Sequence, residues 1–330
     1  MAKVYYDQDT TLSPLEGKTI AVFGYGSQGH AQANNLRDSG VKVIIGLRPG
    51  GKSWEKAKED GFEVYDFPEA AKRADMIQFL LPDERHAEIF EKVKEQITPG
   101  KTIIVSHGFN FHFKRILPPK GVDVIMIAPK APGPTVRREY VNGFGVPALI
   151  AVYQDASGKA KDKALAHAKG IGSTKVGVME TTFQIETETD LFGEQHVLCG
   201  GVVELMRTGF ETLVEAGYPP EAAYFECVHE LKLIVDLIYA NGMYGMYKKV
   251  SNTAKFGGLT RGKKVITPAT KEAMKKGLKQ IQDGTFAKEW IDEEYKKHKL
   301  ANLNRMLEEL KNWQVEKVGK EIRTMAGLEK

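Results

Sequence analysis

Two pairs of acidic residues carry the clearest chemical signal in the sequence. Asp190 with Glu194, and Glu226 with Glu230, stand four residues apart, a spacing that places both carboxylates of a pair on one face of a helix. The rest of each face is apolar, which predicts that the four negative charges are buried in protein. The apolar neighbours are Phe183, Val197, Leu198 and Gly201 for the first pair, and Ala223, Leu233, Ile234 and Leu237 for the second.

Buried carboxylates require a cation, because an unpaired carboxylate in apolar surroundings costs several kcal/mol or takes up a proton. The sequence has no Cys/His spacing of the zinc type, and oxygen ligands favour a hard ion such as Mg²⁺. We therefore expect the two pairs to be metal ligands. The alternative is that they lie on solvated helix faces, as single pairs of this kind usually do.

A glycine-rich turn near the start of the chain predicts a dinucleotide site. Residues 24–29 read Gly-Tyr-Gly-Ser-Gln-Gly, directly after an expected strand at 19–23 and directly before an expected helix that begins near His30. In this context Gly24 permits the tight turn, Gly26 lets a pyrophosphate approach, and Gly29 lets the helix pack on the strand. The alternative is a tight turn that binds nothing.

The end of the second expected strand indicates which dinucleotide is bound. NAD enzymes usually carry an acid there, which bonds the ribose 2′-hydroxyl. This sequence has Arg48, Lys52 and Ser53 instead and no acid in residues 46–53, a set that suits a 2′-phosphate and favours NADP. The alternative is that the two cations are ordinary solvated loop residues.

Three loops follow later strands, where ligands of open α/β sheets bind. They span residues 82–86, 106–110 and 129–134, and they place His107 and Lys130 to meet substrate near the nicotinamide. The alternative is that His107 and Lys130 are simply exposed loop residues. The residues predicted to bind the dinucleotide are Gly24, Tyr25, Gly26, Ser27, Gln28, Arg48, Lys52, Ser53, Asp83, Glu84, Arg85, His86 and Gly133.

The elements that must position these residues fall into two parts. Strand-like runs at 19–23, 41–45, 76–80, 102–105, 122–127 and 148–152 alternate with helical stretches, which predicts an α/β domain with a doubly wound parallel sheet of Rossmann type. Later residues show long helical periods and almost no strand-like alternation. With the seam near Thr181 and Thr182, the expected domains are 1–182, dinucleotide-binding, and 183–330, all helical.

Composition excludes several other classes of protein. The 330 residues are 42% hydrophobic, and 47 basic against 43 acidic residues give a net charge of +4, which is not the one-signed field of a nucleic-acid binder. The two cysteines, Cys199 and Cys227, lie far from any C-x-x-C arrangement, which favours a reducing cytoplasm. No leader-like start and no apolar run of about 18 residues is present, so we expect no membrane segment.

With both sites described, the chain resembles the ketol-acid reductoisomerase (acetohydroxy-acid isomeroreductase) family in its short, class I form, over essentially its whole length. The stretches that carry the resemblance are 24–31 (GYGSQGHA), 106–109 (SHGF), 128–133 (APKAPG), 188–195 (ETDLFGEQ), 226–230 (ECVHE) and 251–254 (SNTA). The resemblance implies that the two acid pairs bind two Mg²⁺ ions, that Ser251 contacts substrate, and that His107 and Lys130 lie in the catalytic site. It also implies a knotted helical domain.

The same resemblance implies a homodimer with shared active sites, and it leaves any higher assembly open. One subunit would contribute Asp190 and Glu194, and its partner Glu226, Glu230 and Ser251. Asp190 would be the bridging metal ligand and Glu194 a terminal one, with Glu226 acting partly through water. Glu230 would relay a proton, and Lys130 would hold Asp190 and a bound water.

The reaction implied by the resemblance belongs to valine, isoleucine and leucine biosynthesis. A Mg²⁺-dependent alkyl shift in 2-acetolactate or 2-aceto-2-hydroxybutyrate is followed by reduction with NADPH. One departure concerns the cofactor: the family commonly has a serine where this chain has Gly51, so use of NADH, or of both cofactors, is plausible. Two alternatives are a metal-independent β-hydroxyacid dehydrogenase and a non-catalytic dinucleotide-sensing module.

Overall fold

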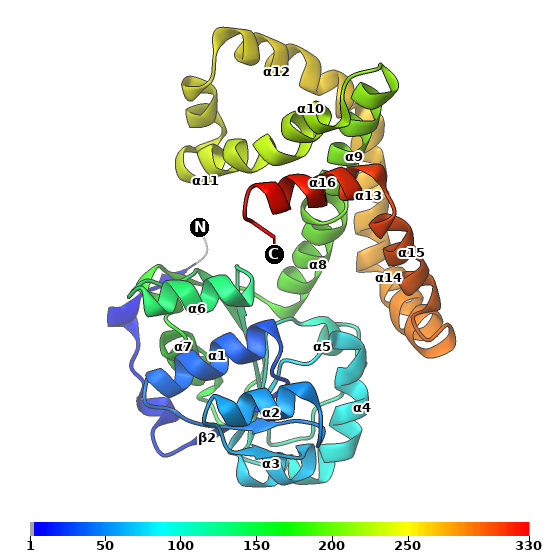
Figure 1. Cartoon of the computed structure of the whole chain (residues 1–330). Helices are drawn as coiled ribbons and strands as arrows, with labels where there is room; N and C mark the ends of the chain where they lie inside the picture. The colour runs from blue at the N-terminus through cyan, green and yellow to red at the C-terminus, as the bar shows by residue number, and fades with distance from the viewer. Residues whose placement is uncertain (1–2, 330) are drawn as a thin grey trace. The chain divides into compact units, whose positions relative to one another are not determined.

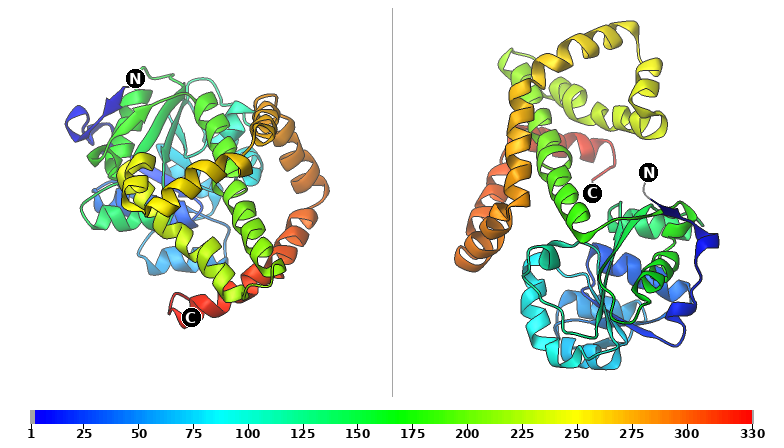
Figure 2. Two further views of the ribbon diagram at one scale, coloured as in Figure 1. Left: turned by 90° about the horizontal axis from the view of Figure 1, so that it is seen from above. Right: turned by 180° about the vertical axis from the view of Figure 1, so that it is seen from behind.

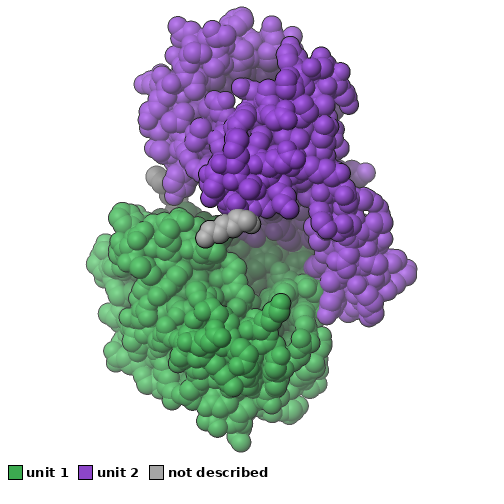
Figure 3. Space-filling view, in the orientation of Figure 1, with its two compact units in different colours: residues 1–187 green, residues 188–330 purple. Residues whose placement is uncertain are grey.

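The computed structural model describes residues 3–329. Met1 and Ala2, on which the expectation of no leader partly rests, lie outside the described residues. The chain forms two compact units, the first ending at Thr187 and the second beginning at Glu188 (Figure 3). This boundary falls inside helix α8 (Phe183–Gly193), so the backbone passes from one unit to the other within a helix. No helix in the described range is both long and apolar enough to span a membrane.

The first unit is built on one sheet, whose described strands lie in the order β1-β9-β8-β7-β6-β5-β2-β3-β4. The strands from β4 to β7 in this order are all parallel, which confirms the predicted α/β class. β8 runs antiparallel to β7, and β1 antiparallel to β9. The bounds are β1 (Val4–Tyr5), β2 (Thr19–Phe23), β3 (Lys42–Gly46), β4 (Val64–Tyr65), β5 (Met76–Phe79), β6 (Thr102–Val105), β7 (Asp123–Pro129), β8 (Ala148–Gln154) and β9 (Val178–Glu180).

The expectation that the strand at 148–152 runs parallel is therefore wrong. An apolar, β-branched run predicts a strand but says nothing of its direction. The short strands β1, β4 and β9 were missed for a related reason, because two or three residues are too few to show a period.

Helices cover both faces of this sheet, because neighbouring strand residues point to opposite sides. Ile20 and Val22 pack with α1 (Ser27–Asp38) and α7 (Ala160–Gly170), whereas Ala21 and Phe23 pack with α3 (Phe67–Arg73) and α4 (Asp83–Val93). Figures 1 and 2 show this three-layer arrangement. The unit also contains α2 (Lys52–Glu59), α5 (Phe109–His112), α6 (Gly133–Val141) and single 3₁₀ turns at Asp7–Asp9, Ser13–Leu15, Lys94–Gln96 and Ser173–Lys175.

The second unit is helical throughout its described residues, as predicted. Its core joins Phe210 of α9, Tyr224 of α10, and Val315 and Ile322 of α16. The α-helices are α8 (Phe183–Gly193), α9 (Gly201–Glu215), α10 (Pro220–Tyr224), α11 (Glu230–Lys249), α12 (Asn252–Val265), α13 (Pro268–Gln282), α14 (Thr285–Lys288), α15 (Ala301–Lys311) and α16 (Gln314–Met325).

Three segments of this unit form wide π-helical turns, at Glu194–Leu198, Phe225–His229 and Glu289–Lys297. Two of them contain predicted metal ligands. Such turns are rare and occur often at functional sites. A further irregularity lies within α11, where Gly242 has φ 71° and ψ 169° and kinks the helix.

Candidate active site

The turn between β2 and α1 has the geometry that a dinucleotide loop needs. Gly24 has a φ of 99°, and a Cβ there would lie 2.6 Å from the carbonyl oxygen of Leu80. A Cβ on Gly29 would lie 2.3 Å from the carbonyl oxygen of Gly24, so helix and strand approach too closely for a side chain. Nothing lies within 4 Å of a Cβ built on Gly26. Gly26 and Ser27, at the start of α1, are exposed and leave room for a pyrophosphate.

The Tyr25 side chain anchors the glycine-rich loop to a neighbouring helix. Its ring is 6% exposed, and its hydroxyl donates a 2.8 Å hydrogen bond to Asp60, the residue after α2. Burial raises the pKa of Tyr25, and the bond to Asp60 raises it further. The glycine-rich turn is thus tied to the helix that carries Lys52 and Ser53.

Gly133 and Gln28 join the loop after β7 to the glycine-rich turn. A Cβ on Gly133, the first residue of α6, would lie 2.1 Å from the carbonyl oxygen of Ser27. The Gln28 side chain donates a 2.9 Å hydrogen bond to the Ala131 carbonyl. The two loops therefore fix each other's position.

A buried chain of polar side chains supports this arrangement from below. Gln32 Nε2 lies 3.0 Å from Gln28 Oε1 and 3.0 Å from Ser106 Oγ, and Gln78 Nε2 donates to Gln32 Oε1 at 2.7 Å. His167 Nε2 lies 3.1 Å from Gln78 Oε1. Burial lowers the pKa of His167 to about 3, so its ring is neutral at physiological pH. This chain of side chains was not predictable from the sequence, because isolated polar residues in apolar runs show no pattern.

The predicted phosphate-binding residues surround one cavity. Arg48, Lys52, Ser53 and Arg85 line a space of about 220 Å³ together with apolar residues that include Trp54, and no acid is among its lining residues. Three cations and a hydroxyl fit a phosphate group.

Residues 83–86, which were predicted to lie in a loop, form the first turn of α4. Asp83, Glu84 and Arg85 are partly exposed at the start of the helix. His86 is only 3% exposed, and its Nε2 lies 2.8 Å from the Leu81 carbonyl oxygen. The His86 ring therefore braces this turn.

A buried carboxylate, Glu186, holds together two of the residues predicted to be catalytic. Its side chain is 1% exposed; it accepts a 2.9 Å hydrogen bond from Lys130 Nζ and lies 3.1 Å from His107 Nδ1. His107 follows β6 and Lys130 follows β7, so two neighbouring strand ends meet the first turn of α8. Burial alone would raise the pKa of Glu186, but His107 and Lys130 outweigh it and lower that pKa below its ordinary value.

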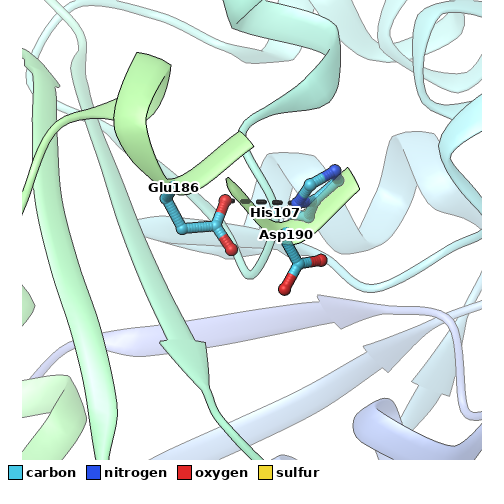
Figure 4. Close-up of side chains that lie close together, drawn as sticks. All are labelled: His107, Glu186 and Asp190. Atoms are coloured by element: carbon cyan, nitrogen blue, oxygen red, sulfur yellow. Dashed lines mark hydrogen bonds and ion pairs between the residues drawn. The ribbon is translucent and has the colours of Figure 1, made fainter. Parts of the chain in front are cut away.

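Asp190 lies one turn further along α8. One ligand atom of Asp190, one of Glu186 and one of His107 all lie within 4.8 Å of one another. Figure 4 shows these three side chains close together. Two carboxylates at this distance fit a hard divalent cation. Glu186 was not among the predicted site residues, although it stands four residues before Asp190, as Asp190 stands four residues before Glu194.

The expectation of buried charge is wrong, within this chain, for the other acids. Glu194, Glu226 and Glu230 are exposed, and so are the apolar neighbours Leu198 (68%) and Leu233 (52%). A helical pattern shows that a face is apolar but not whether the same chain covers it.

Only Asp190 of the four predicted metal ligands joins a group of three candidate ligands among residues 3–329. Ser251 is exposed and caps α12, accepting a 3.1 Å hydrogen bond from the Ala254 backbone nitrogen. The metal and substrate roles of Glu194, Glu226, Glu230 and Ser251 stay predictions.

Two known protein families together match nearly the whole chain. Residues 14–177 match a family described as acetohydroxy acid isomeroreductase, NADPH-binding domain. Residues 183–327 match one described as ketol-acid reductoisomerase, C-terminal domain.

Individual relatives agree with these matches. A protein of Methanocaldococcus jannaschii named ketol-acid reductoisomerase (NADP(+)) is 57% identical, with 100% of both chains covered. One of the same name from Pyrococcus abyssi is 55% identical and covers 100% of this chain and 99% of its own. A solved structure of an NADH-preferring ketol-acid reductoisomerase from an uncultured archaeon has a TM-score of 0.94 and 54% identity, and the match covers 98% of each chain.

Proposed function

Because this chain belongs to the ketol-acid reductoisomerase family, we propose that it converts 2-acetolactate or 2-aceto-2-hydroxybutyrate into the corresponding 2,3-dihydroxy acid. This activity would serve valine, isoleucine and leucine biosynthesis. The observation that carries the proposal is the position of Glu186, which contacts His107 and Lys130 at the ends of β6 and β7 and forms, with His107 and Asp190, one group of candidate metal ligands.

Two Mg²⁺ ions would be held by Asp190 and Glu194 together with Glu226 and Glu230. When bound, the ions would polarise the substrate's hydroxyl, carbonyl and carboxylate oxygens, and the dinucleotide would supply hydride. The Glu186 carboxylate holds the Lys130 ammonium in place, and Lys130 positions Asp190 and water. Glu230 relays a proton at the migrating carbons, and Ser251 donates a hydrogen bond to the substrate.

NADPH is the proposed cofactor, supported by the cationic cavity around Arg48, Lys52 and Arg85. Gly51 nevertheless lacks the hydroxyl that the family commonly offers there. A Cβ at Gly51 would meet only the Arg48 carbonyl oxygen, at 3.6 Å, so nothing within the chain prevents a serine. We therefore propose that NADH also supports turnover.

The proposed assembly is a homodimer in which each site combines Asp190 and Glu194 of one subunit with Glu226, Glu230 and Ser251 of the other. The support is the exposure of the second acid pair together with large apolar side chains on α11 and α12, such as Tyr239 (91%), Met243 (74%) and Phe256 (68%). An uncovered apolar surface of this extent marks an interaction site. Cys199 and Cys227 are both free thiols, which supports the proposed cytoplasmic location.

The decisive experiment measures turnover of 2-acetolactate with NADPH and with NADH, each with and without Mg²⁺. Asp190→Asn and Glu194→Gln should abolish isomerisation and leave dinucleotide affinity nearly unchanged, because the cofactor residues lie on other loops. Full activity in excess chelator would reject the metal role. Metal-independent oxidation of β-hydroxyacids would favour the dehydrogenase alternative, and dinucleotide binding with no turnover would favour a sensing module.

A further inference from the structure

The turn that carries Glu194 is wide, and two glycines follow it. The Cys199 backbone nitrogen donates to the Glu194 carbonyl at 2.9 Å, a bond from residue i+5 to residue i. A Cβ on Gly200 would lie 2.0 Å from the Gln195 carbonyl oxygen, and one on Gly201 would lie 2.1 Å from that of His196. Since the obstacle is backbone, neither position accepts a side chain without opening the turn.

The same turn is seated on a neighbouring helix through His196. A Cβ on Gly277 of α13 would lie 2.0 Å from His196 Nε2, so the ring occupies a notch that only glycine provides. The ring is held on its other side too. It stacks on Phe192 with 4.8 Å between centroids, and its Nδ1 lies 3.2 Å from the Phe192 carbonyl oxygen. The ring cannot swing out of the notch without losing both contacts.

The second acid-bearing turn shows a milder form of this arrangement. Glu226 lies in the π-helical turn Phe225–His229, and Cys227 Sγ lies 3.2 Å from the place of a Cβ on Gly209 of α9. Glycine costs about 1 kcal/mol relative to alanine inside a helix. Gly209 of α9 and Gly277 of α13 therefore make their helices locally less stable. In return, Gly209 leaves room for the Cys227 side chain and Gly277 for the His196 ring.

We propose that Gly277, Gly200 and Gly201 are positioning residues that fix the direction of the Glu194 carboxylate toward Mg²⁺, and that Gly209 does the same for Glu226. The inference rests on the proposed function, because it takes both acids to be metal ligands. A side chain at 277 displaces the His196 ring, the ring displaces the turn, and the turn reorients Glu194.

The test is a double-mutant cycle on the full-length protein, with Mn²⁺ as the probe and the EPR signal of the free ion as the readout. Gly277→Ala should weaken Mn²⁺ binding at least tenfold although it improves helix propensity. His196→Ala, which empties the notch, should weaken it similarly. In the His196→Ala background the added Gly277→Ala should change affinity less than twofold, because no ring remains to displace.

Two measurements separate positioning from general damage. NADPH affinity and the Tm without metal should stay near those of the unmodified protein. Lys276→Ala, at an exposed position next to Gly277 on the same helix, should bind Mn²⁺ within twofold of the unmodified protein.

The inference would be overturned if Gly277→Ala bound Mn²⁺ with an affinity within twofold of the unmodified protein. It would also be overturned if the double variant bound Mn²⁺ a further tenfold more weakly than His196→Ala. If Gly277→Ala does not fold, the Mn²⁺ affinities of His196→Ala and Lys276→Ala are compared instead. Equal affinities of these two variants would reject the role of the His196 ring. Absence of Mn²⁺ binding in the unmodified protein would instead reject the proposed metal function on which the inference rests.

Discussion

Glu186 links the two residues of the first unit that are predicted to be catalytic. Its carboxylate is 1% exposed, and its contacts with Lys130 and His107 hold its pKa below the ordinary value despite burial. The three side chains therefore act as one electrostatic group.

Replacing Glu186 with Gln should lower kcat at least a hundredfold and leave the KM for the dinucleotide nearly unchanged. The shape is retained, but Lys130 and His107 lose the charge that orients them. Removal of one partner of a fully buried ion pair costs about 3–5 kcal/mol; here we expect about 2 kcal/mol, because Lys130 is 34% exposed. Steady-state kinetics and urea unfolding measure the two effects, and a variant with normal kcat would contradict the role.

The stabilising effect of Glu186 should depend on pH. Its pKa in the folded protein lies below the ordinary 4.5, so its contribution is fully present above about pH 4.5 and is lost as the pH falls through the lower folded value. The difference in free energy of unfolding between the unmodified protein and Glu186→Gln should therefore shrink in acid. A difference that is constant from pH 7 to pH 3 would instead show that folding does not lower the pKa of Glu186.

Two substitutions at the cofactor cavity should move preference in opposite directions. Gly51→Ser adds a donor to a 2′-phosphate, worth about 1.5–3 kcal/mol with a charged partner, so the NADPH/NADH ratio of kcat/KM should rise about tenfold or more. Ser53→Asp should lower it by a similar factor through repulsion. If both variants kept the ratio within twofold, the phosphate would have to bind elsewhere.

Single residues were predictable where a motif fixes their neighbours. Arg48, Lys52 and Ser53 do line one cavity with Arg85, because the end of β3 and the start of α2 are adjacent in sequence. Glu186 was missed because its partners lie 79 and 56 residues away, and no local pattern joins them.

At the scale of elements, the sequence predicts whether a segment is a helix or a strand better than it predicts the direction of a strand or the winding of a helix. Alternating apolar runs identified the central strands, yet β8 pairs antiparallel with β7 although α6 lies between them in the sequence, and periodicity does not encode this direction. The π-helical turns were also invisible. Acids four residues apart suggest an ordinary helix, whereas the glycines that open the turn after Glu194 are informative only once their contacts are known.

Helix α6 should prove essential for the dinucleotide loop. Gly133→Ala would place a methyl group 2.1 Å from the Ser27 carbonyl oxygen, so loop and helix must separate. We expect dinucleotide affinity to fall about tenfold, and unfolding free energy to fall by about 1–3 kcal/mol, as for other overpacked sites. Fluorescence titration with NADPH measures the first effect. Thr135→Ala on the same helix is the control, and equal affinities of the two variants would contradict the close approach.

At the scale of the whole molecule, the predicted metal site is not assembled within the described residues of one chain. Its second acid pair and Ser251 are exposed, and only Asp190 of the four predicted metal ligands lies in a candidate ligand group of the described chain. Sequence periodicity suggested that these faces are covered, and a second copy would satisfy that expectation.

Mixed dimers test the shared site directly. Co-expression of an Asp190→Asn subunit with a Glu226→Gln subunit should give heterodimers in which one site carries both lesions and the other carries none. About half of the sites should then be active, measured as 2-acetolactate turnover of the purified heterodimer. If each subunit built its own site, every site would carry one lesion, and a heterodimer of verified composition would be inactive.

The passage of the backbone between the two units inside α8 restricts how relatives can be recombined. A chimaera that joins the front half of one protein to the back half of another at residue 182 keeps the helix whole, but Glu186 then comes from a different parent than His107 and Lys130. A crossover after Thr187 keeps that trio together and instead joins two parents in mid-helix, between Glu186 and Asp190. Cofactor preference is therefore easier to exchange by grafting residues 46–53 than by exchanging halves.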